Sequence, residues 1–217
     1  MIHLGAAWRE GWRWIVRSRA LRVSLLFSLT GFAGIQLIDA QITVLLRDVV
    51  PRKPELIGWV VTAIGAGGLA SVTWLRRYKQ LTKYGWLLGG GVALIGIMFA
   101  AAGMLRESTP LWLILLASVL GGLGTGFTST GMNYILQKET PVEAIGRVSG
   151  IFDSLTSGIL VVAPLAGGIF IGWWGASRTF LFAGLVIGGI GLFGIAMERR
   201  LWRSASKPAD NAASVGA

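Results

Sequence analysis

Apolar residues are concentrated in six long runs, and short polar segments between them hold most of the charge. Each run approaches or exceeds the roughly 20 residues that a helix needs to cross a membrane core. The runs lack the alternation of period two that a membrane β-barrel shows, so the pattern predicts helices. We therefore predict an all-α polytopic membrane protein whose bundle covers residues 23–197. The predicted spanning helices are residues 23–46, 56–75, 84–105, 111–136, 148–174 and 179–197.

Two further segments flank this bundle. Residues 1–22 form a basic amphipathic pattern in which arginines recur at every fourth position and tryptophans gather on another face. The residues concerned are Arg9, Arg13, Arg17, Trp8 and Trp12. Such a helix is too charged to span, so we expect it in the membrane interface with its arginines toward anionic headgroups; an ordinary polar linker is the alternative. Residues 198–217 are predicted to be a disordered cytoplasmic tail, because the chain turns to Ser, Ala, Asn, Asp and Gly after Trp202.

The basic residues are distributed unequally between the two sets of gaps. One set holds fifteen: Arg9, Arg13, Arg17, Arg19, Arg22, Arg76, Arg77, Lys79, Lys83, Lys138, Arg147, Arg199, Arg200, Arg203 and Lys207. The opposite set holds five: Arg47, Arg52, Lys53, Arg106 and Arg178. Because positive charge stays on the cytoplasmic side, both termini are predicted to be cytoplasmic. Six tryptophans at or near run ends fit an interfacial belt: Trp59, Trp74, Trp86, Trp112, Trp173 and Trp174.

Composition narrows the classes of function. The net charge of +10 would usually suggest nucleic acid, but here the charge lies in the gaps of a chain that is 53% hydrophobic, so we expect no nucleic-acid partner. The chain has no cysteine and one histidine, His3, which argues against disulfides and against metal sites built on Cys or His. We expect no cofactor, and no arrangement of acids or nucleophiles indicates an enzyme.

The first run carries an acid among apolar residues. Gln36, Asp39 and Thr43 are spaced three and four apart, so a helix brings them onto one face. An acid costs about 2.5 to 3.5 kcal/mol at the membrane centre and normally faces a cavity or a bundle interior. This polar stripe is a candidate pathway for substrate or protons. The alternative is that Asp39 lies near the end of its helix and reaches the headgroups.

Two later runs hold further candidates. Asn133 shares a helical stripe with Gly122, Gly126 and Ser129, and it either contacts substrate in a cavity wall or makes an interhelical hydrogen bond. Asp153 is a second acid within a run, suited to carry a proton, to act as a gate latch or to reach the interface. The glycine-rich stretch at 121–126 lies inside a spanning run, so it predicts close helix packing and not a dinucleotide loop.

A set of four residues occurs twice along the chain with the same relative spacing. Glu, Ile, Gly and Val at 55, 57, 58 and 60 recur at 143, 145, 146 and 148, a constant offset of 88. The second and fifth runs that they introduce cross the membrane in opposite directions. The pattern therefore suggests that the first three and last three helices form a 3+3 inverted repeat, an arrangement found in transporters.

Four stretches of the chain resemble the C-terminal six-helix half of a major facilitator superfamily transporter, in particular the macrolide- and siderophore-efflux branch. They are residues 10–15 with 18–22, Ile57-Gly58 with 65–68, Gly-Gly-Leu-Gly-Thr-Gly at 121–126 through Asn133 and Gln137, and residues 141–148 with 164–168. The loop at 76–85 keeps the positive charge of a signature loop in that superfamily and lacks its acid. Arg76, Arg77 and Arg147 are candidates for a cytoplasmic gate.

The resemblance implies half of a secondary exporter of amphipathic small molecules in a bacterial cytoplasmic membrane. Proton antiport is implied as the energy source, with Asp39 or Asp153 as the proton carrier. The partner would be an N-terminal six-helix half or a second copy of this chain. The alternative is a truncated or accessory six-helix membrane protein without transport activity of its own.

Overall fold

The computed structural model describes residues 4–49, 55–77, 83–106 and 108–202, and every regular element in these ranges is a helix. The predicted all-α class is therefore confirmed. The helices are α1 (Leu4–Arg17), α2 (Arg19–Val49), α3 (Glu55–Leu75), α4 (Tyr84–Gly103), α5 (Leu111–Glu139), α6 (Val142–Trp174), α7 (Ala176–Ala196) and α8 (Glu198–Leu201). By length and composition α2 to α7 can each cross a membrane, which confirms six spanning helices.

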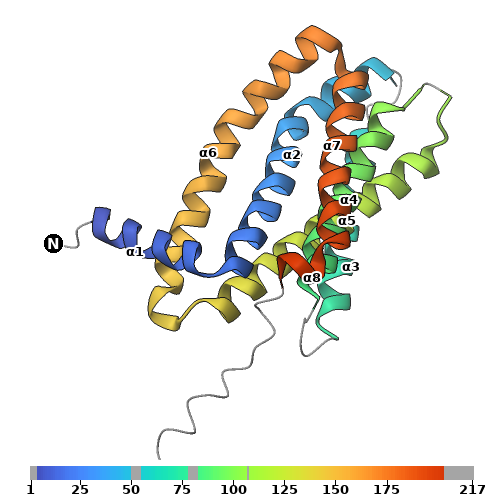
Figure 1. Ribbon diagram of the computed structural model, residues 1–217. Helices are drawn as coiled ribbons and strands as arrows, with labels where there is room; N and C mark the ends of the chain where they lie inside the picture. The colour runs from blue at the N-terminus through green and yellow to red at the C-terminus, as the bar shows by residue number, and fades with distance from the viewer. Residues whose placement is uncertain (1–3, 50–54, 78–82, 107, 203–217) are drawn as a thin grey trace, which may run out of the picture.

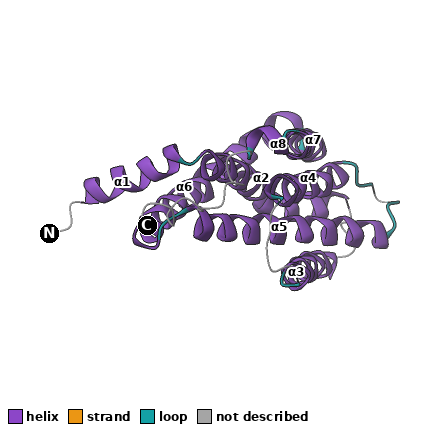
Figure 2. Ribbon diagram, turned by 60° about the horizontal axis from the view of Figure 1, so that its bottom comes forward, coloured by secondary structure: helices purple, strands orange, loops and turns teal. Residues whose placement is uncertain are grey.

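The spanning helices pack in an order that differs from their order in the chain. α4 packs between α7 and α5, and α3 covers the other side of α5 (Figure 2). α6 packs mainly against α2. Figure 1 shows α1 lying across one end of the bundle, the same end at which α8 lies. We call this the α1/α8 end.

The tightest packing in the bundle depends on glycine. A Cβ at Gly96 of α4 would lie 2.7 Å from the carbonyl oxygen of Gly184 and closer still to the backbone of Gly188, both on α7. On α5, Gly122 similarly meets the backbone of Ile64 on α3. Small residues let helices approach to backbone contact where lipid supplies no hydrophobic driving force. The predicted packing role of the glycine at 122 is thus seen directly in the α3–α5 contact.

Part of the contact pattern has the symmetry of an inverted repeat, although the α2–α4 contact has no counterpart between α5 and α7 in the described structure. Exchanging α2, α3 and α4 with α5, α6 and α7 maps the α3–α5 pair onto the α6–α2 pair and maps the α4–α7 pair onto itself. All three pairs are packed in the structure. This symmetry supports the 3+3 repeat, which the sequence suggested from a much weaker signal.

α2 and α6 start four and six residues earlier than the apolar runs indicate. α2 begins at Arg19 instead of residue 23, because Ser18 caps it: the Leu21 amide donates to Ser18 Oγ at 3.2 Å. α6 begins at Val142 instead of residue 148, directly after Pro141, whose extended backbone precedes the first turn. At the other end of α6, Gly175 has a φ of 78°, a left-handed conformation that suits glycine and joins α6 to α7 without further residues. Caps therefore set these boundaries, and hydropathy does not report them.

The start of the predicted tail is ordered. Residues 198–201 form α8, and Trp202 after it is buried, at 5% exposed. Its indole Nε1 donates to Ser24 Oγ on α2 at 2.9 Å, and its ring lies 5.5 Å from that of Phe27. The rest of that tail, 203–217, lies outside the described residues. The difference arises because a single tryptophan with a donor and an apolar ring can fasten a segment whose composition is otherwise polar.

A labelling experiment tests the predicted orientation, and the absence of cysteine makes it simple. Ser108, between α4 and α5, and Glu143, at the start of α6, are both exposed and lie at opposite ends of the bundle. We expect a membrane-impermeant maleimide to label the Ser108→Cys variant in intact cells and the Glu143→Cys variant only after permeabilisation. This result follows from the excess of arginine and lysine at the α1/α8 end. The reverse labelling would contradict the predicted orientation.

Candidate functional site

A cavity of about 330 Å³ lies among α2, α4, α5 and α6. Its lining is mixed, with aromatic and aliphatic side chains beside hydroxyls and one carboxamide. The residues are Ser28, Gly31, Phe32, Ile35, Ile95, Thr125, Thr128, Ser129, Met132, Asn133, Phe152 and Thr156. No charged side chain is among these lining residues. A small site of this kind can surround an apolar molecule and orient it by a few polar contacts.

The polar side chains of the cavity mostly use their donors within their own helices. Thr125 and Thr128 donate to carbonyl oxygens one turn back on α5, at 3.0 and 2.9 Å. Thr156 does the same on α6, at 3.1 Å. The Asn133 amide donates to the Ser129 carbonyl at 3.0 Å. The hydroxyl oxygens and the Asn133 carbonyl oxygen therefore keep lone pairs that can accept hydrogen bonds from a ligand.

Ser28 differs from the other hydroxyl residues. Its Oγ is buried, with the residue 4% exposed, and it has no hydrogen-bond partner among the residues that the structure describes. A buried hydroxyl without a partner costs about 1 to 3 kcal/mol, which a polar group bound in the cavity would offset. Sequence reasoning did not single out Ser28. The available signal was spacing: Ser28, Phe32 and Ile35 recur at helical intervals, and Asp39 continues the series four residues later.

The structure places the sequence candidates in different surroundings. Asn133 lines the cavity, and within the described residues its side chain bonds only to its own helix, so the interhelical bond considered above is not found there. Asp153 is exposed on α6, beside the cavity residue Phe152 but outside the lining. Gln36 is half-buried on α2 and does not line the cavity. Asp39 and Thr43 lie within α2, but their side chains are outside the described part of the structure.

The arginines predicted at a gate lie at the α1/α8 end. Arg76 and Arg77 are exposed in the turn after α3, next to the undescribed residues 78–82. Arg147 is on the first turns of α6, and its Nη1 lies 2.5 Å from Oε1 of Glu10 on α1. Both side chains are nearly half exposed, so the ion pair contributes at most about 1 kcal/mol. Its importance is geometric, because it joins α1 to α6.

Other contacts fasten the same end. Ser18 Oγ donates to Glu139 Oε2 at the end of α5, at 3.4 Å. The ammonium of Lys138 lies 5.4 and 5.6 Å from the ring centroids of Tyr84 and Tyr134, within cation–π range. These contacts connect α1, α4 and α5 around one end of the bundle.

Glu198 on α8 lies near the same end, and the surroundings of its carboxyl perturb its ionisation. Burial raises the pKa of its carboxyl, while Lys83 and Arg199 act in the opposite direction. Its side chain packs over Gly85 on α4, where a Cβ would lie 2.8 Å from Glu198 Cβ. Across the described ranges, no group of three or more His, Cys, Asp or Glu side chains gathers as a metal site would need.

A comparison with protein families accounts for this architecture. The sequence profile of the Major Facilitator Superfamily matches residues 53–216, well over half of the chain. The chain therefore belongs to the Major Facilitator Superfamily, whose members are membrane transporters.

Individual relatives agree with that assignment. An uncharacterized MFS-type transporter, YfiS of Bacillus subtilis, is 30% identical over 188 residues, which are 85% of this chain and 44% of that protein. The multidrug efflux pump Tap of Mycolicibacterium fortuitum is 29% identical over 72% of this chain and 38% of its own length. A multi-drug resistance efflux pump, a PmrA homolog of Lactococcus lactis, is 28% identical over 64% of this chain and 34% of its own length. The chain spans less than half the length of these relatives. No solved structure matches it significantly.

Proposed function

We propose that the chain forms one six-helix half of a proton-coupled secondary exporter of amphipathic small molecules in a bacterial cytoplasmic membrane. The observation that carries the proposal is the cavity with its mixed apolar and hydroxyl lining and the unpaired hydroxyl of Ser28. Relatives named as multidrug efflux pumps support export as the direction of transport. Alternating access would rock this bundle against a second one around a site near the midplane.

The outward faces of two helices support a second bundle as partner. α6 and α3 are the least buried of the six spanning helices, and α4 is the most buried. Gly58 and Gly65 on α3, and Gly146 and Gly150 on α6, have no other group close to the position of a Cβ. Such open glycine positions suit close approach of other helices. The partner is either an N-terminal six-helix half or a second copy of this chain.

The proton carrier is proposed to be Asp39 or Asp153. Asp39 continues the helical spacing of the α2 residues that line the cavity, with Gln36 and Thr43 nearby on the same helix. Asp153 follows the cavity residue Phe152 on α6. An acid that gains and loses a proton as the bundle rocks would couple the gradient to export. Arg76, Arg77 and Arg147 would then contribute to the gate at the cytoplasmic end.

A second candidate is an accessory or truncated six-helix membrane protein without transport activity of its own. Because the chain spans less than half the length of the relatives compared above, their whole-protein activity is itself only proposed for it. The two candidates share the fold and differ in whether the cavity works in transport. They are therefore separated by transport measurements and not by structure.

Transport of ethidium in everted vesicles tests the proposal. We express the full chain alone and together with an N-terminal six-helix half from the Bacillus subtilis relative, and energise the vesicles with a proton gradient. We expect uptake in at least one arrangement, loss of uptake on adding an uncoupler, and its abolition by Asp39→Asn or Asp153→Asn, whichever acid carries the proton. Asn133→Ala should raise the half-saturating ethidium concentration roughly three- to tenfold, the value of one neutral hydrogen bond.

The controls distinguish the alternatives. Ser177→Ala, on the exposed first turn of α7, should leave uptake unchanged, because it lies outside the cavity and outside the two helices proposed to face the partner bundle. Uptake by the chain alone would indicate a homodimer, and uptake only with the second half a split transporter. A well-folded chain that transports in neither arrangement would favour the accessory protein.

A further inference from the structure

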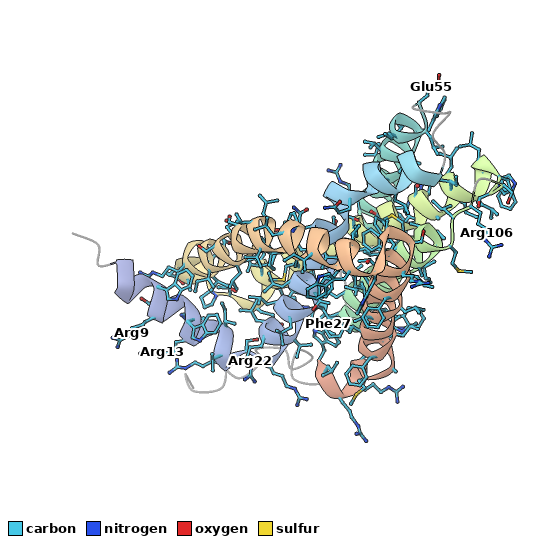
Figure 3. The ribbon with its side chains drawn as sticks, turned by 90° about the horizontal axis from the view of Figure 1, so that it is seen from above. Arg9, Arg13, Arg22, Phe27, Glu55 and Arg106 are labelled. Carbon is cyan, nitrogen blue, oxygen red and sulfur yellow. The ribbon has the colours of Figure 1, made fainter. Side chains whose placement is uncertain are left out.

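α1 carries two exposed stripes of different chemistry. Arg9, Arg13 and Arg17 form a basic stripe, and all three are exposed. Beside it lie Trp8, Trp12 and Val16, each 46% exposed. In Figure 3, Arg9, Arg13 and Arg22 lie along one outer edge of α1 and the start of α2. Arg19 and Arg22 extend the basic stripe past the junction of the two helices and are also exposed.

The opposite side of α1 is fixed to α6. A Cβ at Gly11 would lie 2.8 Å from Ile151 Cδ1 and 3.1 Å from the Arg147 carbonyl oxygen, so the helices are in direct contact. Ile15, one turn further, is buried at 2% exposed. The pair between Glu10 and Arg147 closes the same contact. The bundle therefore sets the rotation of α1, and with it the direction of both exposed stripes.

The charges on the exposed side are not neutralised within the described chain. The ion pair between Glu10 and Arg147 is the one found in those ranges, and it lies on the α6 side of α1. Three arginines one turn apart present guanidinium groups that match phosphate oxygens in geometry as well as charge. A soluble acidic partner would not need the adjacent indole stripe, whereas tryptophan is at home at the boundary of headgroups and acyl chains.

We propose that α1 and the start of α2 form a binding surface for anionic phospholipid headgroups, with the arginine stripe on the phosphates and the Trp8, Trp12 and Val16 stripe in the boundary below them. Because α1 is joined to the first turns of α6, the bound lipid holds the end of α6 that leads to the cavity residues Phe152 and Thr156. The composition of the bilayer thereby biases the position of one cavity wall. Lipid binding at this surface does not require that the chain transport anything.

The test uses the full chain in lipid nanodiscs, with a single reporter. A polarity-sensitive fluorophore is attached to the Val16→Cys variant, which is specific because the chain has no other cysteine. Replacing phosphatidylcholine by phosphatidylglycerol should shift the emission to the blue as α1 seats in the interface. Replacing Arg9, Arg13 and Arg17 together by Gln should lower the affinity of this surface for phosphatidylglycerol on the order of 100-fold, at about fivefold per arginine. The blue shift should fall accordingly. About 1 M salt should weaken it as well, since it screens beyond about 3 Å.

Matched variants keep the result interpretable. Arg106→Gln with Arg178→Gln removes two exposed arginines from the opposite end and should leave the response intact. Replacing the three α1 arginines by Lys should preserve most of it, because the charge remains. An equal response to phosphatidylcholine, or an undiminished one in the Gln variant, would overturn the proposal. A response to soluble glycerol phosphate as large as that to the lipid would also overturn it, because the surface would then be a simple anion site.

Discussion

Gly96→Ala will lower the stability of the bundle by about 1 to 3 kcal/mol, whereas Gly90→Ala on the same helix will leave it unchanged or raise it. The first substitution puts a methyl group against the α7 backbone at Gly184 and Gly188, neither of which can move without separating α4 from α7. At Gly90 nothing lies within reach of a Cβ. There the helical preference of alanine over glycine, roughly 0.5 to 1 kcal/mol, is the main effect.

Thermal unfolding of both variants in the same detergent measures this difference. Because they share a helix and a chemical change, detergent effects and helix propensity largely cancel between them. Equal melting temperatures would mean that the α4–α7 contact is looser than the structure shows. Gly191→Ala, which meets the backbone of Ala93 on the same interface, should behave like Gly96→Ala.

Ser24→Ala and Ser28→Ala will have opposite effects, although both serines are buried on α2 and lie one turn apart. Ser24 accepts the bond from the Trp202 indole, so its loss leaves a buried donor unpaired and should cost about 1 to 3 kcal/mol. Ser28 has no partner in the described structure, so its replacement should be neutral or slightly stabilising. Ser28→Ala should nevertheless weaken ethidium transport, because the cavity loses a buried donor hydroxyl that has no partner among the described residues.

The pair is measured by thermal unfolding and by the vesicle assay on the same preparations. Trp202→Phe supplies a check, since it removes the indole donor and keeps a ring against Phe27. It should make Ser24→Ala nearly harmless in the double variant, because the two changes then remove both ends of one bond. If Ser28→Ala were the more destabilising serine variant, Ser28 would have a structural partner and no role in binding.

Hydropathy sufficed to predict the helical class and the six spans, because a run of about 20 apolar residues has few other stable structures. It missed where α2 and α6 begin, since Ser18 and Pro141 act through caps that a window average does not register. The helical stripe through Asn133 correctly indicated a cavity wall, since Ser129 and Asn133 line the cavity. Ser24 and Ser28, by contrast, are indistinguishable in sequence, and only Trp202, far along the chain, decides which one is satisfied.

The candidate gate shows a similar limit. Arg147 was selected for its position in a basic loop, and nothing in the sequence pairs it with Glu10, which lies on a different helix. Asp39 and Asp153 were selected because acids are costly in a membrane, a rule that identifies residues without assigning partners. Their roles remain predictions that the transport measurements test.

The bond between Trp202 and Ser24 has a consequence for the order in which the protein is built. The two residues are 178 positions apart, and Ser24 is in α2, which is synthesised before the other five spanning helices of this bundle. At about 5 to 20 residues per second, Ser24 waits roughly 10 to 35 s before its partner is synthesised. During that interval the Ser24 hydroxyl lacks this donor and the Phe27 ring lacks its contact with the Trp202 ring. This contact can therefore close only after all six spanning helices of the bundle have been synthesised.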